Sequence, residues 1–191
     1  PSDDRFRTAY ANQLVAIGRF EDAIGVYEDI ASRNPNSAPL HLLTGHALKT
    51  IGRVDEAISA YRSAYQYRPK YGDAYWSLAN LKTYRFDDLE IERMRAEEAA
   101  SDTPLEDRIH FCFALGKAFE DRKDYETAAE FYERGNSLKR DDAAYSANRM
   151  THQLELQKTH CNRNYFALRE GHGCLDPAPI FIVGLPRAGS T

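Results

Sequence analysis

The chain has 191 residues, of which 42% are apolar and 28% charged, and its formal net charge at pH 7 is -4. An acidic chain has no general attraction for phosphate backbones or anionic lipids, so we expect neither nucleic acid nor a membrane surface as partner. No stretch reaches the roughly 20 consecutive apolar residues of a membrane helix, and no signal peptide is evident, so we expect a cytoplasmic location. Because the sequence begins at Pro1 rather than at a methionine, we expect the natural start to lie upstream.

The cysteines indicate free thiols rather than a cross-linked scaffold. Cys112, Cys161 and Cys174 are odd in number and have no C-x-x-C spacing, which is typical of a reducing compartment. Together with His160 and His172, the last two cysteines offer nitrogen and sulfur ligands for zinc. Ligands at adjacent positions fit a tetrahedral site poorly, so we expect no metal site.

A 34-residue repeat organises most of the chain. Four landmark residues recur at that interval, where Gly18, Ala23, Tyr27 and Pro35 are followed by Gly52, Ala57, Tyr61 and Pro69. The pattern returns two periods and three residues after Gly45, Ala57 and Tyr61, as Gly116, Ala128 and Tyr132. A divergent copy must lie between them, from Tyr75 to about Ala100. Its second helix is expected to be irregular, because Ile91 and Arg95 replace the alanine and the aromatic residue.

This pattern resembles the tetratricopeptide repeat, a helix-turn-helix unit with Leu-Gly, Ala-x-x-x-aromatic and proline landmarks, over about residues 4–137. The first-helix aromatic residue of that family is replaced by Arg7, His41 and Cys112 in three copies. The resemblance implies an all-α solenoid in residues 1–137, in which small residues let the paired helices approach and prolines end the second helices. The repeats are predicted at about residues 4–37, 38–71, 72–108 and 109–140.

In such solenoids the first helices line a concave side, where an extended peptide or protein segment binds. The positions expected to face that side are Asn12, His46, Lys49, Trp76, Asn80 and Lys117. The asparagines would bond the peptide backbone, Lys49 and Lys117 would hold a carboxylate, and Trp76 would be the main anchor. The alternative is that these are solvated polar residues, with Trp76 half-buried between repeats. Self-association of the repeats is a further possibility.

The repeat pattern stops after Asn136. Apolar side chains continue at helical spacing through residues 141–170, which predicts one longer helix that caps the last repeat. Gly171, Gly173 and Pro177 then interrupt the helical pattern. We therefore expect a linker at residues 171–178.

A different architecture is predicted to begin at residues 179–191. The apolar run from Ile180 to Val183 indicates a buried parallel strand. It is followed, from Gly184 to Thr191, by the spacing G-x-x-x-x-G-S-T, a phosphate loop with serine in place of the usual lysine. Such a turn presents backbone amides to an anion and does so without the lysine.

Residues 179–191 are similar to the 5′-phosphosulfate loop of sulfotransferases, and repeats ahead of such a loop occur in bacterial relatives of tyrosylprotein sulfotransferases. The resemblance implies 3′-phosphoadenosine 5′-phosphosulfate (PAPS) as co-substrate. Arg187 would stabilise the sulfuryl group, while Ala188, Gly189, Ser190 and Thr191 would bind the 5′-phosphate. The general base and the 3′-phosphate site of that family are absent, so this fragment is not expected to catalyse the transfer. The alternatives are another phosphate binder and a pure adaptor without enzymatic activity.

Overall fold

The computed structural model describes residues 3–143 and 146–173, which form helices and loops with no strand among them. The contacts divide the chain into two units, Pro1–Ala144 and Tyr145–Thr191. The first unit contains α1 (Asp4–Ala16), α2 (Phe20–Arg33), α3 (Ala38–Thr50), α4 (Val54–Tyr67), α5 (Gly72–Ala79), α6 (Asp88–Ala99), α7 (Leu105–Asp121) and α8 (Tyr125–Ala143). The predicted all-α repeat fold is therefore confirmed for the described residues, and none of their helices is long and apolar enough to cross a membrane.

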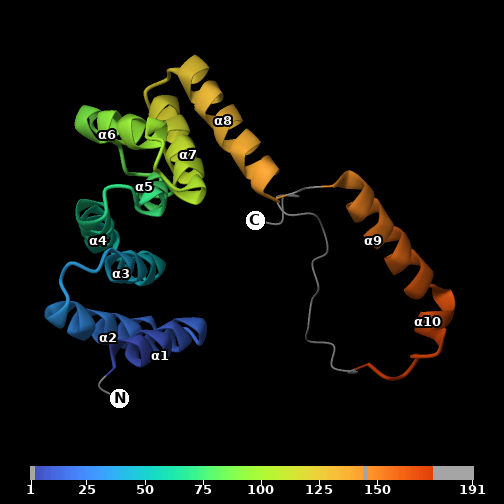
Figure 1. Cartoon of the computed structure of the whole chain (residues 1–191). Coiled ribbons are helices and arrows are strands. Elements are labelled where there is room, and N and C mark those ends of the chain that lie inside the picture. The colour runs from blue at the N-terminus through green and yellow to red at the C-terminus, as the bar shows by residue number, and fades with distance from the viewer. Residues whose placement is uncertain (1–2, 144–145, 174–191) are drawn as a thin grey trace. The chain divides into compact units, whose positions relative to one another are not determined.

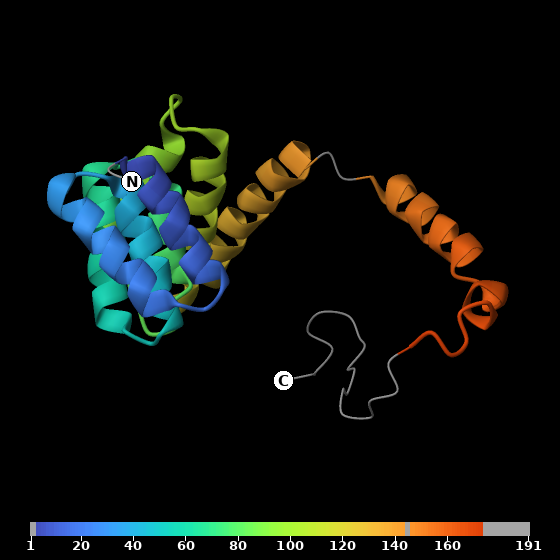
Figure 2. The same cartoon turned by 90° about the horizontal axis from the view of Figure 1, so that it is seen from below.

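Helical hairpins stack in chain order within the first unit (Figures 1 and 2). The pairs α1 and α2, α3 and α4, and α7 and α8 pack together, and α2 and α4 also pack on the first helix that follows each of them. The small landmark residues make this close approach possible. A Cβ atom built on Gly45 would lie 2.5 Å from Tyr61 Cε1, and one on Gly116 would lie 2.6 Å from Tyr132 Cδ1. Each glycine thus leaves room for the tyrosine of its own second helix.

The turns inside the hairpins require a left-handed backbone. Gly18 and Gly52 have φ angles of +80° and +82°, which glycine adopts without steric cost. The equivalent residue of the last repeat is Lys123, and it has a φ of +64°. A lysine therefore occupies a conformation that the other two hairpins reserve for glycine.

The third repeat departs from the regular pattern at a place that the sequence did not indicate. The predicted irregular second helix is wrong, because α6 is continuous and begins with a capping box formed by Asp87 and Glu90. The first helix is the short one: α5 has 8 residues and is followed by a loop through residues 80–87. Tyr84 and Phe86 of that loop are buried. The first helix α5 packs on α4 and α7, and α6 packs on α7.

Buried carboxylates join the elements around this divergent repeat. Glu90 accepts hydrogen bonds from the hydroxyls of Tyr65 (2.8 Å) and Tyr84 (2.5 Å). Asp107 accepts bonds from the Arg68 guanidinium (2.6 Å) and from the Gly72 amide (3.0 Å). These charged acceptors connect α6 with α4 and with the loop after α5, and α7 with the start of α5.

A third buried carboxylate, Glu98, links α6 with α7 and α8. It pairs with Arg134 at 3.0 Å and with Arg108 at 4.0 Å. The Cys112 thiol donates a weak hydrogen bond to it at 3.6 Å. Burial raises the pKa of Cys112 to about 12, so this thiol is protonated at neutral pH and unreactive.

The second unit holds α9 (Ala147–His160) and α10 (Arg163–Ala167). The single helix predicted over residues 141–170 is wrong in its bounds, because α8 runs to Ala143 and a new helix starts after Ser146, which caps it. Asn162 caps α10 in the same way. No side chain of α9 or α10 is buried, so these two helices form no core in their own unit. The residues predicted as strand and phosphate loop, 179–191, lie outside the described residues, as does most of the predicted linker.

Candidate protein-binding face

One repeated position carries much of the predicted binding face. Asn12, His46, Asn80 and Lys117 each directly follow the small landmark residue of a first helix. In the two regular repeats this side chain is hydrogen-bonded to the second-helix tyrosine. Tyr27 donates its hydroxyl proton to Asn12 Oδ1 at 2.6 Å, and His46 Nδ1 lies 3.0 Å from the Tyr61 hydroxyl oxygen. These hydrogen bonds fix the direction of both side chains. Sequence analysis assigned Tyr27 and Tyr61 only to helix packing and so did not predict that they bond to the binding face.

His46 is held in its neutral form. Its ring meets Tyr61 edge-on, with centroids 5.5 Å apart. Desolvation lowers the pKa of His46, the nearby Lys49 lowers it further, and Asp73 opposes the shift. Since the first of these effects is the largest, His46 presents a neutral ring beside the positive charge of Lys49 at neutral pH.

An aromatic pair connects α5 and α7, the last two of the four first helices α1, α3, α5 and α7. Trp76 of α5 and Phe113 of α7 are both half-buried, with ring centroids 5.5 Å apart. Trp76 also packs against the main core cluster, which agrees with the alternative interpretation that it is half-buried between repeats. Because both rings are partly exposed, part of the pair is accessible to a ligand.

Phe113 was missed by the sequence analysis, although a signal for it exists. Phe113 precedes Gly116 by three residues, and Trp76 precedes Ala79 by the same interval. The two aromatic residues therefore occupy the same position in successive repeats. An alignment of the repeats on Ala79 and Gly116 places Trp76 and Phe113 at the same position.

The two predicted carboxylate-binding lysines differ in their surroundings. Lys117 forms an ion pair with Asp121 one turn further along α7, and Arg85 lies 3.4 Å from the same carboxylate. Lys49 is exposed, and within the described residues no ion pair is formed by its ammonium group. Lys49 is thus the better placed of the two to receive a carboxylate from a ligand.

The remaining predicted residues take local roles or lie outside the described part. Asn80 ends α5 and donates a hydrogen bond from Nδ2 to the Trp76 carbonyl at 3.0 Å. Arg187 and the other four residues predicted to bind PAPS lie outside the described residues. Among those that the structure does describe, no cluster of histidine, cysteine and carboxylate side chains could hold a metal ion.

Comparison with known proteins decides the family. Two family models, both described as tetratricopeptide repeat, match residues 8–79 and 109–142. This chain is a tetratricopeptide repeat protein. The interval between the two matches contains most of the divergent third repeat. Tetratricopeptide repeats are protein-interaction scaffolds, and both matched segments end before the predicted phosphate loop.

Solved structures with the same fold include a crystal structure of MamA, with 21% identity and a TM-score of 0.56, covering 76% of this chain and 83% of that chain. A MamA fragment from Desulfovibrio magneticus RS-1 has 19% identity and a TM-score of 0.51, with coverage of 73% and 77%. BtubC (BKLC) from P. vanneervenii has 17% identity and a TM-score of 0.55, with coverage of 75% and 65%. At these identities the likeness concerns the fold alone.

One curated relative is an uncharacterized protein from Aquifex aeolicus (strain VF5). It is 26% identical to this tetratricopeptide chain over 148 residues, which make up 76% of the chain and 19% of the relative. The chain therefore spans about a fifth of the length of that relative.

Proposed function

We propose that the first-helix face of this tetratricopeptide unit binds an extended segment of a partner protein. The observation that carries the proposal is the half-buried pair of Trp76 and Phe113 on adjacent first helices. Rigid aromatic side chains that are partly desolvated before binding are the usual energetic anchors of protein interfaces. They would contact an apolar side chain of the ligand.

The polar groups beside this pair give the ligand a direction. Lys49 lies on α3 with an uncompensated charge, whereas Lys117 on α7 is neutralised by Asp121. Asn12 uses its carbonyl oxygen for Tyr27 and so retains its amide donors for a peptide backbone. The ligand is therefore a segment with a large apolar residue at α5 and α7 and a carboxylate toward α3.

Selection from a random-peptide library displayed on phage tests this function. We expect the chain to enrich peptides that combine an aromatic or large aliphatic residue with an acidic one. Trp76→Ala should weaken binding of a selected peptide about 30-fold, the loss typical of an interface anchor. Trp76 also packs against the core, so its replacement could affect folding. Lys49→Glu is therefore the second variant, and it should weaken the binding of acidic peptides without disturbing the fold.

Leu89→Ala is the matched control, since Leu89 is exposed and belongs to α6, the second helix of its repeat. Fluorescence anisotropy of a labelled peptide would measure all three variants. Failure to enrich any peptide, or equal binding by the wild type and both face variants, would rule the proposed site out.

A second candidate function rests on residues 179–191. We propose PAPS-dependent sulfotransferase activity for the protein that carries them, supported by the sequence Gly184–Thr191 and its similarity to the 5′-phosphosulfate loop. The test is calorimetric titration of PAPS or its desulfonated product into a protein that extends beyond Thr191. Binding that is lost in Arg187→Ala supports this function. If the folded protein does not bind either nucleotide, only the scaffold function remains.

A further inference from the structure

The first-helix face carries opposite charges at one repeated position. Lys49 of α3 lies four residues after Gly45, and Glu120 of α7 lies four residues after Gly116. Because these glycines are the small landmarks of their repeats, the two charged residues are equivalent. Both of their side chains are exposed. The face therefore presents a cation on α3 and a carboxylate at the corresponding position of α7.

Glu120 belongs to the same stripe of α7 as the aromatic residue of the face. Phe113, Lys117 and Glu120 are spaced by four and then three residues, which places their side chains along one side of the helix. Phe113 is the half-buried partner of Trp76. The carboxylate thus follows the aromatic pair after about two turns of α7, within reach of the same extended ligand.

The tyrosine of the last hairpin orients this carboxylate. Tyr132 donates its hydroxyl proton to Glu120 Oε2 at 2.8 Å. In the two regular repeats the equivalent hydroxyls bond instead to Asn12 and His46, which directly follow the landmark. In the last repeat that position is Lys117, whose ammonium group cannot accept a proton. The Tyr132 hydroxyl therefore turns to Glu120 and holds one of its two oxygens.

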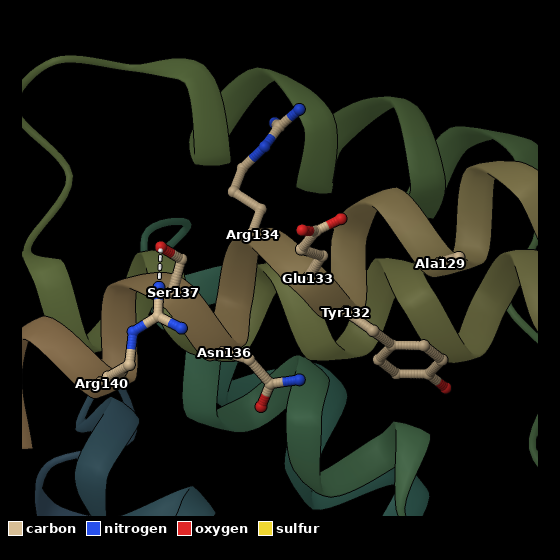
Figure 3. A pocket seen from close by; sticks show the side chains of 7 residues that line it. All are labelled: Ala129, Tyr132, Glu133, Arg134, Asn136, Ser137 and Arg140. Carbon is tan, nitrogen blue, oxygen red and sulfur yellow. Dashed lines mark hydrogen bonds between the residues drawn. The ribbon is translucent and has the colours of Figure 1, made fainter. Parts of the chain in front are cut away.

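The direction of Tyr132 supports this role. Figure 3 shows Tyr132 and Arg134 pointing to opposite sides of the α8 ribbon. Arg134 reaches Glu98 of α6 at 3.0 Å, whereas the Tyr132 ring packs against Gly116 of α7. The hydroxyl bonded to Glu120 is thus separate from the buried network around Glu98.

The negative charge of Glu120 is not neutralised by an ion pair in the described part of the chain. Lys117 and Arg85 both pair with the adjacent Asp121. Arg85 also donates hydrogen bonds to two carbonyl groups of the loop after α5. The hydroxyl that Glu120 accepts is neutral, so it orients the carboxylate without cancelling its charge.

We propose that Glu120 determines the charge specificity of the face, by selecting ligands that carry a basic residue toward α7. This inference rests on the peptide-binding function proposed above and extends it. The ligand then has a carboxylate toward α3, a large apolar residue at Trp76 and Phe113, and an ammonium or guanidinium group toward α7. A ligand with the opposite charge order would place like charges together, so the face favours one orientation.

Three sets of synthetic peptides that differ at one residue test this specificity. Each peptide has a glutamate on one side of a central tryptophan and lysine, glutamine or glutamate on the other side, at a series of spacings. Fluorescence anisotropy should show the lysine peptides binding about 3-fold more tightly than the glutamine peptides, a modest factor because the charge pair is exposed. The glutamate peptides should bind most weakly, and added salt should reduce these differences.

Glu120→Gln isolates the charge, because glutamine can still accept the Tyr132 hydroxyl proton. This variant should lose the preference for lysine peptides, and Glu120→Lys should reverse the preference in favour of glutamate peptides. Glu92→Gln is the matched control, since it removes the same charge from an exposed residue of α6. The control should keep the preference of the wild type.

The outcomes separate this inference from the function on which it rests. The inference is overturned if the wild type does not distinguish the three sets, if the preference for lysine survives in Glu120→Gln, or if Glu92→Gln abolishes it equally. In each of these cases, weaker binding by Trp76→Ala and Lys49→Glu would still support the peptide-binding face. If none of the peptides binds to the wild type, the face and the role of Glu120 both fail.

Discussion

The second and third repeats occupy neighbouring stretches of sequence but are held together by different interactions. In the second repeat, Gly45 of α3 receives the ring of Tyr61 from α4, and the two helices pack directly. In the third, Arg95 stands where the tyrosine would be, and α5 packs on α4 and α7 instead. Glu90 and the buried loop residues Tyr84 and Phe86 take over the connection. The third repeat thus lacks the contact between its own two helices, and hydrogen bonds from α6 to α4 and to the loop hold it in place.

The largest effect is expected from truncating the central aromatic residue of the regular repeat. Tyr61 is fully buried, so Tyr61→Ala should lower the free energy of unfolding by about 4 kcal/mol. The equivalent Arg95 is exposed and lies over the Phe119 ring with its guanidinium 4.8 Å from the centroid. Arg95→Ala should therefore cost less than about 1 kcal/mol. Urea denaturation of both variants measures the contrast, and equal losses would contradict it.

In the second prediction, the large loss of stability is expected in the third repeat and the small one in the second. Removing the buried carboxylate with Glu90→Ala leaves the hydroxyls of Tyr65 and Tyr84 without their acceptor, and should cost about 3 kcal/mol. The equivalent residue of the second repeat is Glu56, which is exposed and within the described structure pairs only with Arg53, the residue before α4. Glu56→Ala should have little effect. Thermal unfolding would show a clear fall in melting temperature for the first variant alone.

A smaller effect is expected at the hairpin turns. Lys123 pays a steric cost for its positive φ, so Lys123→Gly should stabilise the chain by about 1 kcal/mol. Gly52→Ala places a side chain in the same conformation and should destabilise it by a similar amount. The same urea series measures both, and a loss of stability on Lys123→Gly would show that the turn lysine makes a contact that outweighs its strain.

The smallest expected effect is the pH dependence of stability that His46 gives to the second repeat. Because the pKa of His46 is lowered in the folded chain, the unfolded chain binds the proton first as pH falls. The stability that His46 contributes is complete above the ordinary histidine pKa and is lost as pH falls through the lower folded value. His46→Gln should reduce the slope of stability against pH in that window. An unchanged slope in chemical denaturation at several pH values would mean that other groups cause it.

The regular hairpins could be predicted because their contacts are encoded by single residues at a fixed spacing. Glycine and tyrosine at Gly45 and Tyr61 specify one close approach, and the period repeats it. The loop at residues 80–87 could not be predicted in this way. Its burial depends on Glu90, whose partners lie 6 and 25 residues away and carry no local signal.

Some features of the candidate binding face could also be predicted from the sequence, and others could not. Phe113 was recoverable from its register with Trp76, and the pairing of Lys117 with Asp121 follows from their spacing of one helical turn. The approach of Arg85 to Asp121 depends on the path of the loop after α5, which no periodicity describes. The hydrogen bonds of Tyr27 and Tyr61 to the first-helix face also required the hairpin geometry. Residue type identified the face, and tertiary structure decided which of its groups remain available.

The way α5 is held has a consequence for how this chain could be rearranged. In a solenoid of independent hairpins, one repeat can be deleted or duplicated because each hairpin contacts only its neighbours. Here α7 is supported by both helices of the third repeat, and Asp107 of α7 caps the start of α5. We therefore expect residues 72–121 to fold as one unit. We expect insertions and domain exchanges to be tolerated at the turn before α3 and to fail anywhere between α5 and α7.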